Sequence, residues 1–138
     1  MHVPVFLPAQ WTTAAWTVWA ANPAPGVLQT RATGHADVAA VEKLTAAYDS
    51  IERVVPRVDV FHDWAGITGY APDARVLYTA WSKAHGHTVG TVAILMKSPL
   101  VSMGISVANI VLGGTLKPFT NRAQWEALLA STVARRGG

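Results

Sequence analysis

Thr88-Val89-Gly90-Thr91-Val92-Ala93-Ile94-Leu95-Met96 is the stretch that decides the fold. Its second half is apolar on both of the faces that alternate along a strand, which is typical of a central strand in a parallel sheet covered by helices. Ser98-Pro99 follows directly, and a capping residue before a first-turn proline predicts the start of a helix. We therefore predict a buried parallel strand that leads into a crossover helix.

Amphipathic helices are predicted before and after this strand in the sequence, because apolar side chains recur there three or four residues apart. The four apolar stripes are Val38, Val41, Leu44, Tyr48, Ile51 and Val55; Ala74, Leu77, Trp81 and Ala84; Leu100, Met103, Val107, Ile110 and Val111; and Trp125, Leu128, Leu129 and Val133. Asp37 is a good N-cap for the first helix, and Pro56 stops it. Thr120 precedes the last helix as its cap.

Further strands are predicted between these helices. Val58 to Phe61 forms a short strand that ends at His62-Asp63, and residues 66–70 read as a glycine-punctuated loop. The pieces 16–19 and 27–33 flank an Asn-Pro-Ala-Pro-Gly turn and predict a hairpin. The sequence thus predicts an α/β fold with a single mostly parallel, mixed sheet of about five strands, four helices and an N-terminal β-hairpin.

The chain length of 138 residues fits one domain. We predict an N-terminal arm over residues 1–15, which holds Pro4 and Pro8 and has no clear period, and a folded domain over 16–134. Residues 135–138 are expected to form a flexible C-terminal tail.

Composition excludes several classes of protein. The chain has no cysteine, which rules out disulfides and zinc–thiolate sites. Its eleven basic and eight acidic residues are scattered, so no clustered footprint for nucleic acid is visible. The apolar runs are far too short to span a bilayer and no secretory signal is recognised, so we expect a cytoplasmic protein. Only 14% of residues are charged, which favours a surface covered by a partner or by another copy.

Catalytic and metal signatures are not found. Gly104-Ile105-Ser106-Val107-Ala108 resembles a nucleophile elbow, but Ser106 lies inside a predicted helix rather than at a sharp strand-to-helix turn. His85 and His87 flank a helix stop, whereas His62 is placed at the carboxyl end of its strand, so the sheet should separate them. We predict no enzyme activity, no metal site and no cofactor.

The carboxyl ends of parallel strands are where ligands and partners usually bind. Two segments occupy such ends, residues 63–70 and 97–102. Trp64 and Tyr70 lie in the first of them, and these two aromatic residues are the candidate anchors for a partner.

The segment from Trp16 to Leu129 resembles the STAS domain, the sulfate-transporter and anti-sigma-factor-antagonist fold, and especially its divergent SpoIIAA-like branch. Three features carry the resemblance besides the order of elements: Val60-Phe61-His62-Asp63-Trp64 leading to Gly66-Ile67-Thr68-Gly69-Tyr70; the strand Val92-Ala93-Ile94-Leu95 before a helix; and Lys117-Pro118-Phe119 before Arg122-Ala123-Gln124-Trp125.

The resemblance implies a partner surface at the loop after the central strand. It assigns partner binding to Asp63, Trp64, Gly66, Thr68, Gly69 and Tyr70. The family's phosphorylatable Ser or Thr at the helix start is replaced here by Gly69-Tyr70-Ala71, and Thr68, the nearest hydroxyl, is the candidate phosphorylation site. The resemblance favours a non-enzymatic interaction module with a regulatory or scaffold role and a protein partner.

A second hypothesis is a carrier of a small apolar, lipid-like ligand, because other STAS-like proteins resemble such carriers. Its pocket would lie between helices and sheet and would be lined by Tyr70, Leu77, Trp81, Leu100 and Met103. The alternative is that these five side chains simply pack against one another.

Overall fold

Strands and helices alternate along the chain as the sequence predicts. The computed structural model describes residues 5–137. Its elements are β1 (Ala9–Thr12), β2 (Trp16–Ala24), β3 (Val27–Ala36), α1 (Val38–Glu52), β4 (Val58–Tyr70), α2 (Pro72–Ala84), β5 (Val89–Leu95), α3 (Pro99–Leu112), β6 (Leu116–Phe119) and α4 (Arg122–Gly137).

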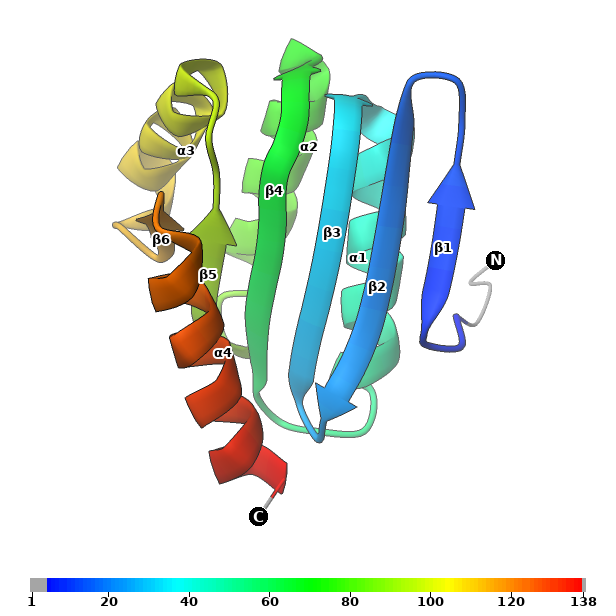
Figure 1. Ribbon diagram of the computed structural model, residues 1–138, viewed down its shortest axis with the longest axis vertical. Coiled ribbons are helices and arrows are strands. Elements are labelled where there is room, and N and C mark those ends of the chain that lie inside the picture. The colour runs from blue at the N-terminus through cyan, green and yellow to red at the C-terminus, as the bar shows by residue number, and fades with distance from the viewer. Residues whose placement is uncertain (1–4, 138) are drawn as a thin grey trace.

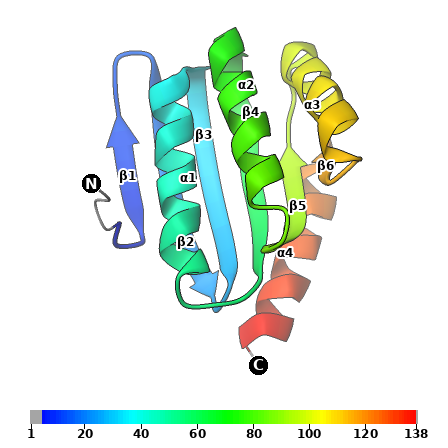
Figure 2. The same ribbon diagram turned by 180° about the vertical axis from the view of Figure 1, so that it is seen from behind.

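The six strands form one mixed sheet in which their order in space is their order in the chain. The pairs β1–β2 and β2–β3 are antiparallel, and the pairs from β3 to β6 are parallel. Crossovers of one hand place α1, α2 and α3 on the same face, while α4 crosses the other face (Figures 1 and 2). In many open α/β sheets, ligands bind at the point where the order of the strands reverses direction. This sheet has no such point, because its strands follow one another in chain order.

Both ends of the described chain are more ordered than the sequence predicts. Residues 9–12, within the predicted arm, form β1 and add an antiparallel edge strand, which makes six strands rather than about five. Residues 135–137 continue α4 instead of forming a flexible tail, because the Arg136 guanidinium donates to the carbonyls of Pro25 and Arg57. Residues 1–4 and 138 of the predicted arm and tail lie outside the described residues.

The turn between β2 and β3 is the predicted Pro-Gly hairpin turn. Gly26 has a positive φ of 73°, a conformation that favours glycine. A Cβ atom there would also overlap the guanidinium of Arg136. This turn is thus one end of a tertiary contact with α4.

The predicted apolar stripe faces the core in α1, does so in part in α2, where Ala74 is buried and Trp81 packs against the core, and faces away from it in α3. Asp37 caps α1 through Ala40 N at 3.0 Å, and the predicted Val41, Leu44, Tyr48 and Ile51 are buried. In α2 the buried residues are Ala74, Tyr78 and Thr79, and in α3 they are Val101, Gly104, Ile105 and Ala108. The stripe predicted for α3 points away from the sheet, because Val101 and Ile105, together with the small Gly104 and Ala108, face inward instead.

Candidate functional site

The predicted partner loop at residues 63–70 is not a loop. β4 continues without interruption to Tyr70, and its second half pairs with β3 from Thr33↔Gly66 to Ala36↔Tyr70. The neighbouring β5 ends at Leu95, opposite Asp63, so β3 and β4 rise above the rest of the parallel sheet (Figure 1). The two glycines that suggested a loop lie within a strand.

Those glycines are explained by close neighbours on β3. A Cβ atom on Gly66 would lie 2.7 Å from Thr33 Cγ2, and one on Gly69 would lie 3.2 Å from His35 Nδ1. Small residues are found in strands where another chain segment approaches closely. Gly66 and Gly69 therefore serve packing between strands, and the loop interpretation of them is wrong.

Asp63 is a buried ion-pair partner of α4. Its carboxylate accepts from Arg122 Nη1 at 2.8 Å and lies 3.7 Å from Arg31 Nε. The hydrogen bond to Asp63 is the largest contribution that raises the pKa of Arg122. Asp59, four residues earlier on the same face, pairs with Arg136 at 3.3 Å. The two aspartates therefore hold the two ends of α4 on β4.

Trp64 and Tyr70 are not exposed side by side. Trp64 is only 9% exposed and stacks on His62, with ring centroids 4.6 Å apart. Tyr70 is half-buried, donates to the Leu100 carbonyl at 3.3 Å and packs against Gly104. Both therefore belong to the packing between the sheet and its helices, and the prediction of Trp64 as an exposed anchor is wrong.

Thr68 is exposed near the end of β4. Its hydroxyl is therefore accessible, and its phosphorylation stays a prediction. The six residues assigned to partner binding do not form one surface, because Asp63 contacts α4 on one face of the sheet while Trp64 packs on the other.

A buried polar chain under α2 was not predicted from the sequence. Thr30 Oγ1 is 2.6 Å from His62 Nδ1, and His62 Nε2 is 3.0 Å from the Tyr78 hydroxyl. Desolvation lowers the pKa of His62 to about 3 and raises the pKa of Tyr78 above its usual range. His62 is therefore neutral, and both of its ring nitrogens have partners. The alternation along β4, which points residue 62 to the same side as Val60, is the signal that indicates its burial.

Two cavities lie between this face of the sheet and its helices. The first, of about 80 Å³, is lined by Trp64, Tyr70, Tyr78 and mainly small or apolar residues of α1, α2 and α3. The second, of about 180 Å³, is lined by His62, Tyr78, Trp81 and residues near the opposite ends of the helices. Leu44, Tyr78 and Leu116 line both, so the cavities adjoin.

The five side chains predicted to line an apolar pocket do not line one space together. Of these five residues, Tyr70 borders the first cavity and Trp81 the second. Leu77, Leu100 and Met103 are exposed instead. The error follows from the outward position of Leu77 on α2 and of the predicted stripe on α3.

The outer face of α3 is apolar. We call its five exposed residues the α3 face: Leu100, Met103, Val107, Ile110 and Val111. Their exposure ranges from 40% for Val107 to 83% for Ile110. No residue of α3 is charged. A surface helix normally carries charged or polar residues on its outer side, so this face is unusual.

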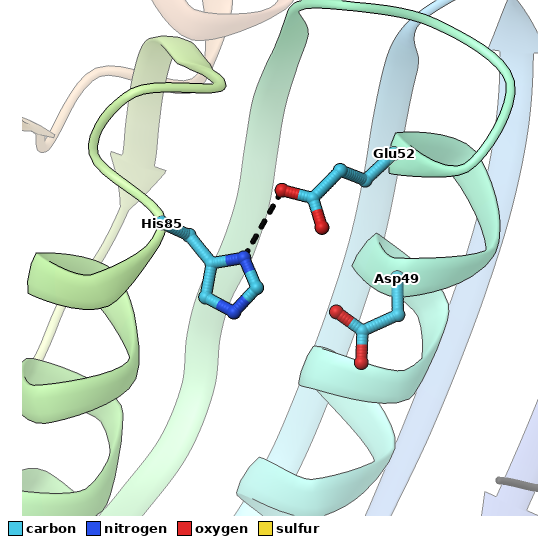
Figure 3. Close-up of side chains that lie close together, drawn as sticks. All are labelled: Asp49, Glu52 and His85. Carbon is cyan, nitrogen blue, oxygen red and sulfur yellow. Dashed lines mark hydrogen bonds and ion pairs between the residues drawn. The ribbon is translucent and has the colours of Figure 1, made fainter.

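Asp49, Glu52 and His85 meet between α1 and the end of α2 (Figure 3). Their ligand-type atoms lie within 4.8 Å of one another, and carboxylate and imidazole groups are donors that Zn²⁺ accepts. Glu52 already accepts from Thr88 and lies 3.0 Å from His85 Nδ1. Burial would raise the pKa of Glu52, but the hydrogen bonds with Thr88 and His85, together with the electrostatic attraction of His85 and His87, outweigh burial and lower it. These contacts link α1 to the end of α2.

The histidines considered for a shared metal site occupy different environments. His62 is enclosed by Thr30 and Tyr78, whereas His85 pairs with Glu52 and stacks on Trp81 at 4.3 Å. This agrees with their expected placement apart along the sheet.

Comparison with known proteins supports the fold. No protein-family model matches the chain, and no curated protein does. A solved structure of an uncharacterised protein of the DUF3478 family, from Shewanella loihica PV-4 and with a SpoIIAA-like fold, is similar at a TM-score of 0.62 and 19% identity. The match covers 86% of this chain and 97% of that one. The resemblance to SpoIIAA-like domains is thus confirmed at the level of the fold.

Proposed function

We propose that this SpoIIAA-like chain is a non-enzymatic protein-interaction module that binds a second copy of itself through the α3 face. The observation that carries the proposal is a helix without charge whose five large outer side chains are exposed. Exposed contiguous apolar surface of this kind marks interaction sites. A regulatory or scaffold role would then act through the assembly rather than through the end of β4.

The size of the face fits an interface. Taking about 180 Å² for each fully exposed residue, the exposures of these five side chains correspond to roughly 500 Å² of surface, near the upper range for the largest apolar patch of a monomer. A standard interface buries about 800 Å² on each partner, so the α3 face would form its apolar centre and polar neighbours its rim.

A second copy is the occupant that the chemistry of this face favours. Most soluble oligomers are twofold homodimers, in which the same patch meets itself. Because α3 has no charged residue, two copies can pack α3 against α3 without opposing like charges. A helix that lies on a membrane usually carries Lys and Arg along its polar face, and α3 carries neither. Only 14% of the residues are charged, which agrees with a surface that is covered by another copy.

Analytical ultracentrifugation of the full chain tests the proposal. The double variant Met103→Glu with Ile110→Glu places two charges at the centre of the face, and we expect it to be monomeric where the wild type is dimeric. Val54→Glu is the matched control, because Val54 is 77% exposed beyond the end of α1 and outside the α3 face. That variant should remain dimeric.

Three results would contradict the proposal. The first is a wild-type protein that stays monomeric at about 100 μM, a concentration at which even weak specific dimers form. The second is a double variant, folded by circular dichroism, that dimerises as the wild type does. The third is co-sedimentation of the wild type with phosphatidylcholine vesicles that the double variant loses, since this would assign the face to a membrane. No helix among residues 5–137 is long and apolar enough to cross one.

A further inference from the structure

Two carboxylates and an imidazole converge between α1 and the end of α2, on residues that the α3 face does not include (Figure 3). Asp49 and Glu52 are three residues apart on α1, so they share one side of that helix. His85 follows the last residue of α2 as its C-cap. One ligand-type atom of each residue lies within 4.8 Å of the other two. Three donor side chains from two helices therefore meet at one place.

The spacing of these donors is close to that of a metal site. Nδ1 of His85 lies 3.0 Å from the Glu52 carboxylate. Zn²⁺ holds imidazole nitrogen and carboxylate oxygen at about 2.0–2.2 Å, so two ligand atoms of a tetrahedral ion are roughly 3.4 Å apart. An ion can therefore replace the hydrogen bond between these two atoms if they separate by about 0.4 Å. Asp49 needs a shift of at most about 1.4 Å from the 4.8 Å limit, which rotation of one side chain provides.

Neighbouring side chains hold two of the three donors in place. The His85 ring stacks on Trp81, with ring centroids 4.3 Å apart, and meets the edge of Tyr48 at 5.8 Å. The Thr88 hydroxyl donates to the Glu52 carboxylate and lies 2.7 Å from the Tyr48 hydroxyl. Metal ligands in proteins are usually oriented by hydrogen bonds of this kind. His85 and Glu52 are thus positioned before an ion binds.

The place of the cluster at two helix ends favours a cation. Aligned peptide dipoles leave partial negative charge at the C-terminus of a helix, where basic side chains are stabilising. α1 instead ends with Asp49 and Glu52, has no basic residue in its last turn and has Arg53 only at its C-cap. α2, with Lys83 in its last turn, ends at the same edge of the sheet (Figure 2). Two carboxylates at a negative helix end cost free energy that a bound cation offsets, and this argument is independent of the donor distances.

The imidazole indicates the class of ion. Carboxylates alone suit Mg²⁺ and Ca²⁺, whereas imidazole suits Zn²⁺ and neighbouring transition metals. The expectation of no metal site rests on the distance between His85 and His62 along the sheet, and it does not include the carboxylates of α1 as partners. Those carboxylates precede His85 by more than thirty residues in the chain, so only the fold brings the three donors together.

We propose that Asp49, Glu52 and His85 form a binding site for one divalent transition-metal ion of the Zn²⁺ class, which links the C-terminal ends of α1 and α2. Each residue supplies one ligand atom, and water completes the coordination. Thr88 is a positioning residue, because it contacts Glu52 rather than the ion. The site goes beyond the dimer proposed above and does not depend on it.

Titration calorimetry of Zn²⁺ into the untagged full chain, treated with EDTA and dialysed, tests the site. We expect one ion per chain with a dissociation constant of about 10 μM or below, and a shift of the His85 ring-nitrogen resonances in ¹⁵N NMR spectra. Asp49→Asn, Glu52→Gln and His85→Gln, made singly, should each weaken Zn²⁺ binding at least about tenfold, since even the loss of a residue that only orients a ligand costs about that much. A large excess of Mg²⁺ should not compete, because imidazole is a poor ligand for it.

Matched controls separate this site from other modes of binding. Glu42→Gln removes an exposed carboxylate from α1, and His35→Gln removes an exposed imidazole from β3. Both variants should bind Zn²⁺ within about twofold of the wild type, because they lie outside the cluster. His87→Ala is the sharper control, because His87 is exposed two residues after His85, and this pair alone can chelate a metal at the surface. It should also stay within about threefold of the wild type.

The proposal is overturned by any of three results. One is the absence of Zn²⁺ binding to the wild type up to about 100 μM, tenfold above the expected dissociation constant. Another is wild-type affinity in a His85→Gln protein that is folded by circular dichroism. The last is a tenfold loss in His87→Ala while folded Asp49→Asn and Glu52→Gln proteins bind as the wild type does, since this would assign the ion to a His-Gly-His chelate at the surface.

Discussion

Acidification should destabilise the protein through His62. Burial lowers the pKa of this histidine from 6.5 to about 3, so the folded protein keeps a neutral ring while the unfolded chain takes up a proton below pH 6.5. The unfolded state then binds more protons, and stability falls as pH falls. The contribution of His62 is fully present above pH 6.5 and is lost progressively between pH 6.5 and 3.

The size of the effect follows from the two pKa values. Between pH 7 and pH 5, proton uptake by the unfolded chain lowers the free energy of unfolding by about 2 kcal/mol, since each pKa unit corresponds to about 1.4 kcal/mol. With a urea m-value of about 2 kcal/mol/M, the midpoint of urea unfolding should fall by about 1 M from this residue alone. Burial keeps the His62 ring neutral in the folded protein over this pH range.

A matched variant isolates this contribution. His62→Gln retains a side chain that can both donate to and accept from Thr30 and Tyr78, but it does not titrate. Urea unfolding of both proteins at pH 7 and pH 5 gives two losses of stability, and the loss in the wild type should exceed that in the variant by about 2 kcal/mol. An excess below about 0.5 kcal/mol would refute the reasoning, since it would mean that His62 is solvated or charged in the folded state.

Three further predictions concern packing and ion pairs. Arg122→Ala should lower the free energy of unfolding by about 1–3 kcal/mol at pH 7, measured by urea unfolding, because the buried carboxylate of Asp63 loses its shortest ion pair; a change below about 0.5 kcal/mol would contradict this account. Gly104→Ala should cost about 1–3 kcal/mol, because its Cβ would lie 2.6 Å from the Tyr70 hydroxyl, and Tyr70→Phe should restore part of that loss in the double variant. The lowered pKa of Glu52 makes the wild type lose stability at acidic pH, as its carboxylate is protonated. Glu52→Gln should therefore make the free energy of unfolding less dependent on pH in that range. Parallel pH profiles of the free energy of unfolding for the two proteins would contradict this account.

The sequence predicts the order of elements well because the signals are local. The continuous apolar run at 92–95 identified the buried β5, and Asp37 with its downstream stripe identified α1. Both features depend on residues that are close in the chain, so no knowledge of the tertiary structure was needed.

The errors arise where tertiary contacts override local patterns. Gly66 and Gly69 resemble loop residues, yet β3 crowds them within a strand. In α3 the large apolar side chains were assigned to the core, but Gly104 faces inward because Tyr70 occupies the space beside it. A helix that is apolar on two sides does not reveal from its own pattern which side meets the sheet.

The candidate sites share this limit. The buried position of His62 follows from alternation along β4, but its contacts with Thr30 and Tyr78 join residues 32 and 16 positions away. The first cavity is lined by alanines from β3, α1, α2 and α3, and alanine carries no chemical signature in a sequence. The low share of charged residues predicts a covered surface but does not indicate which helix would be covered.

Neighbouring strands in the sheet are also consecutive in the chain. The strands can therefore pair one after another in the order in which they are synthesised. Each strand leaving the ribosome finds its pairing edge already present in the nascent protein, and no early strand must wait for a distant one. The exception is α4, whose Arg136 returns to the turn after β2, 111 residues earlier. α4 therefore links the far side of the sheet to the turn between β2 and β3.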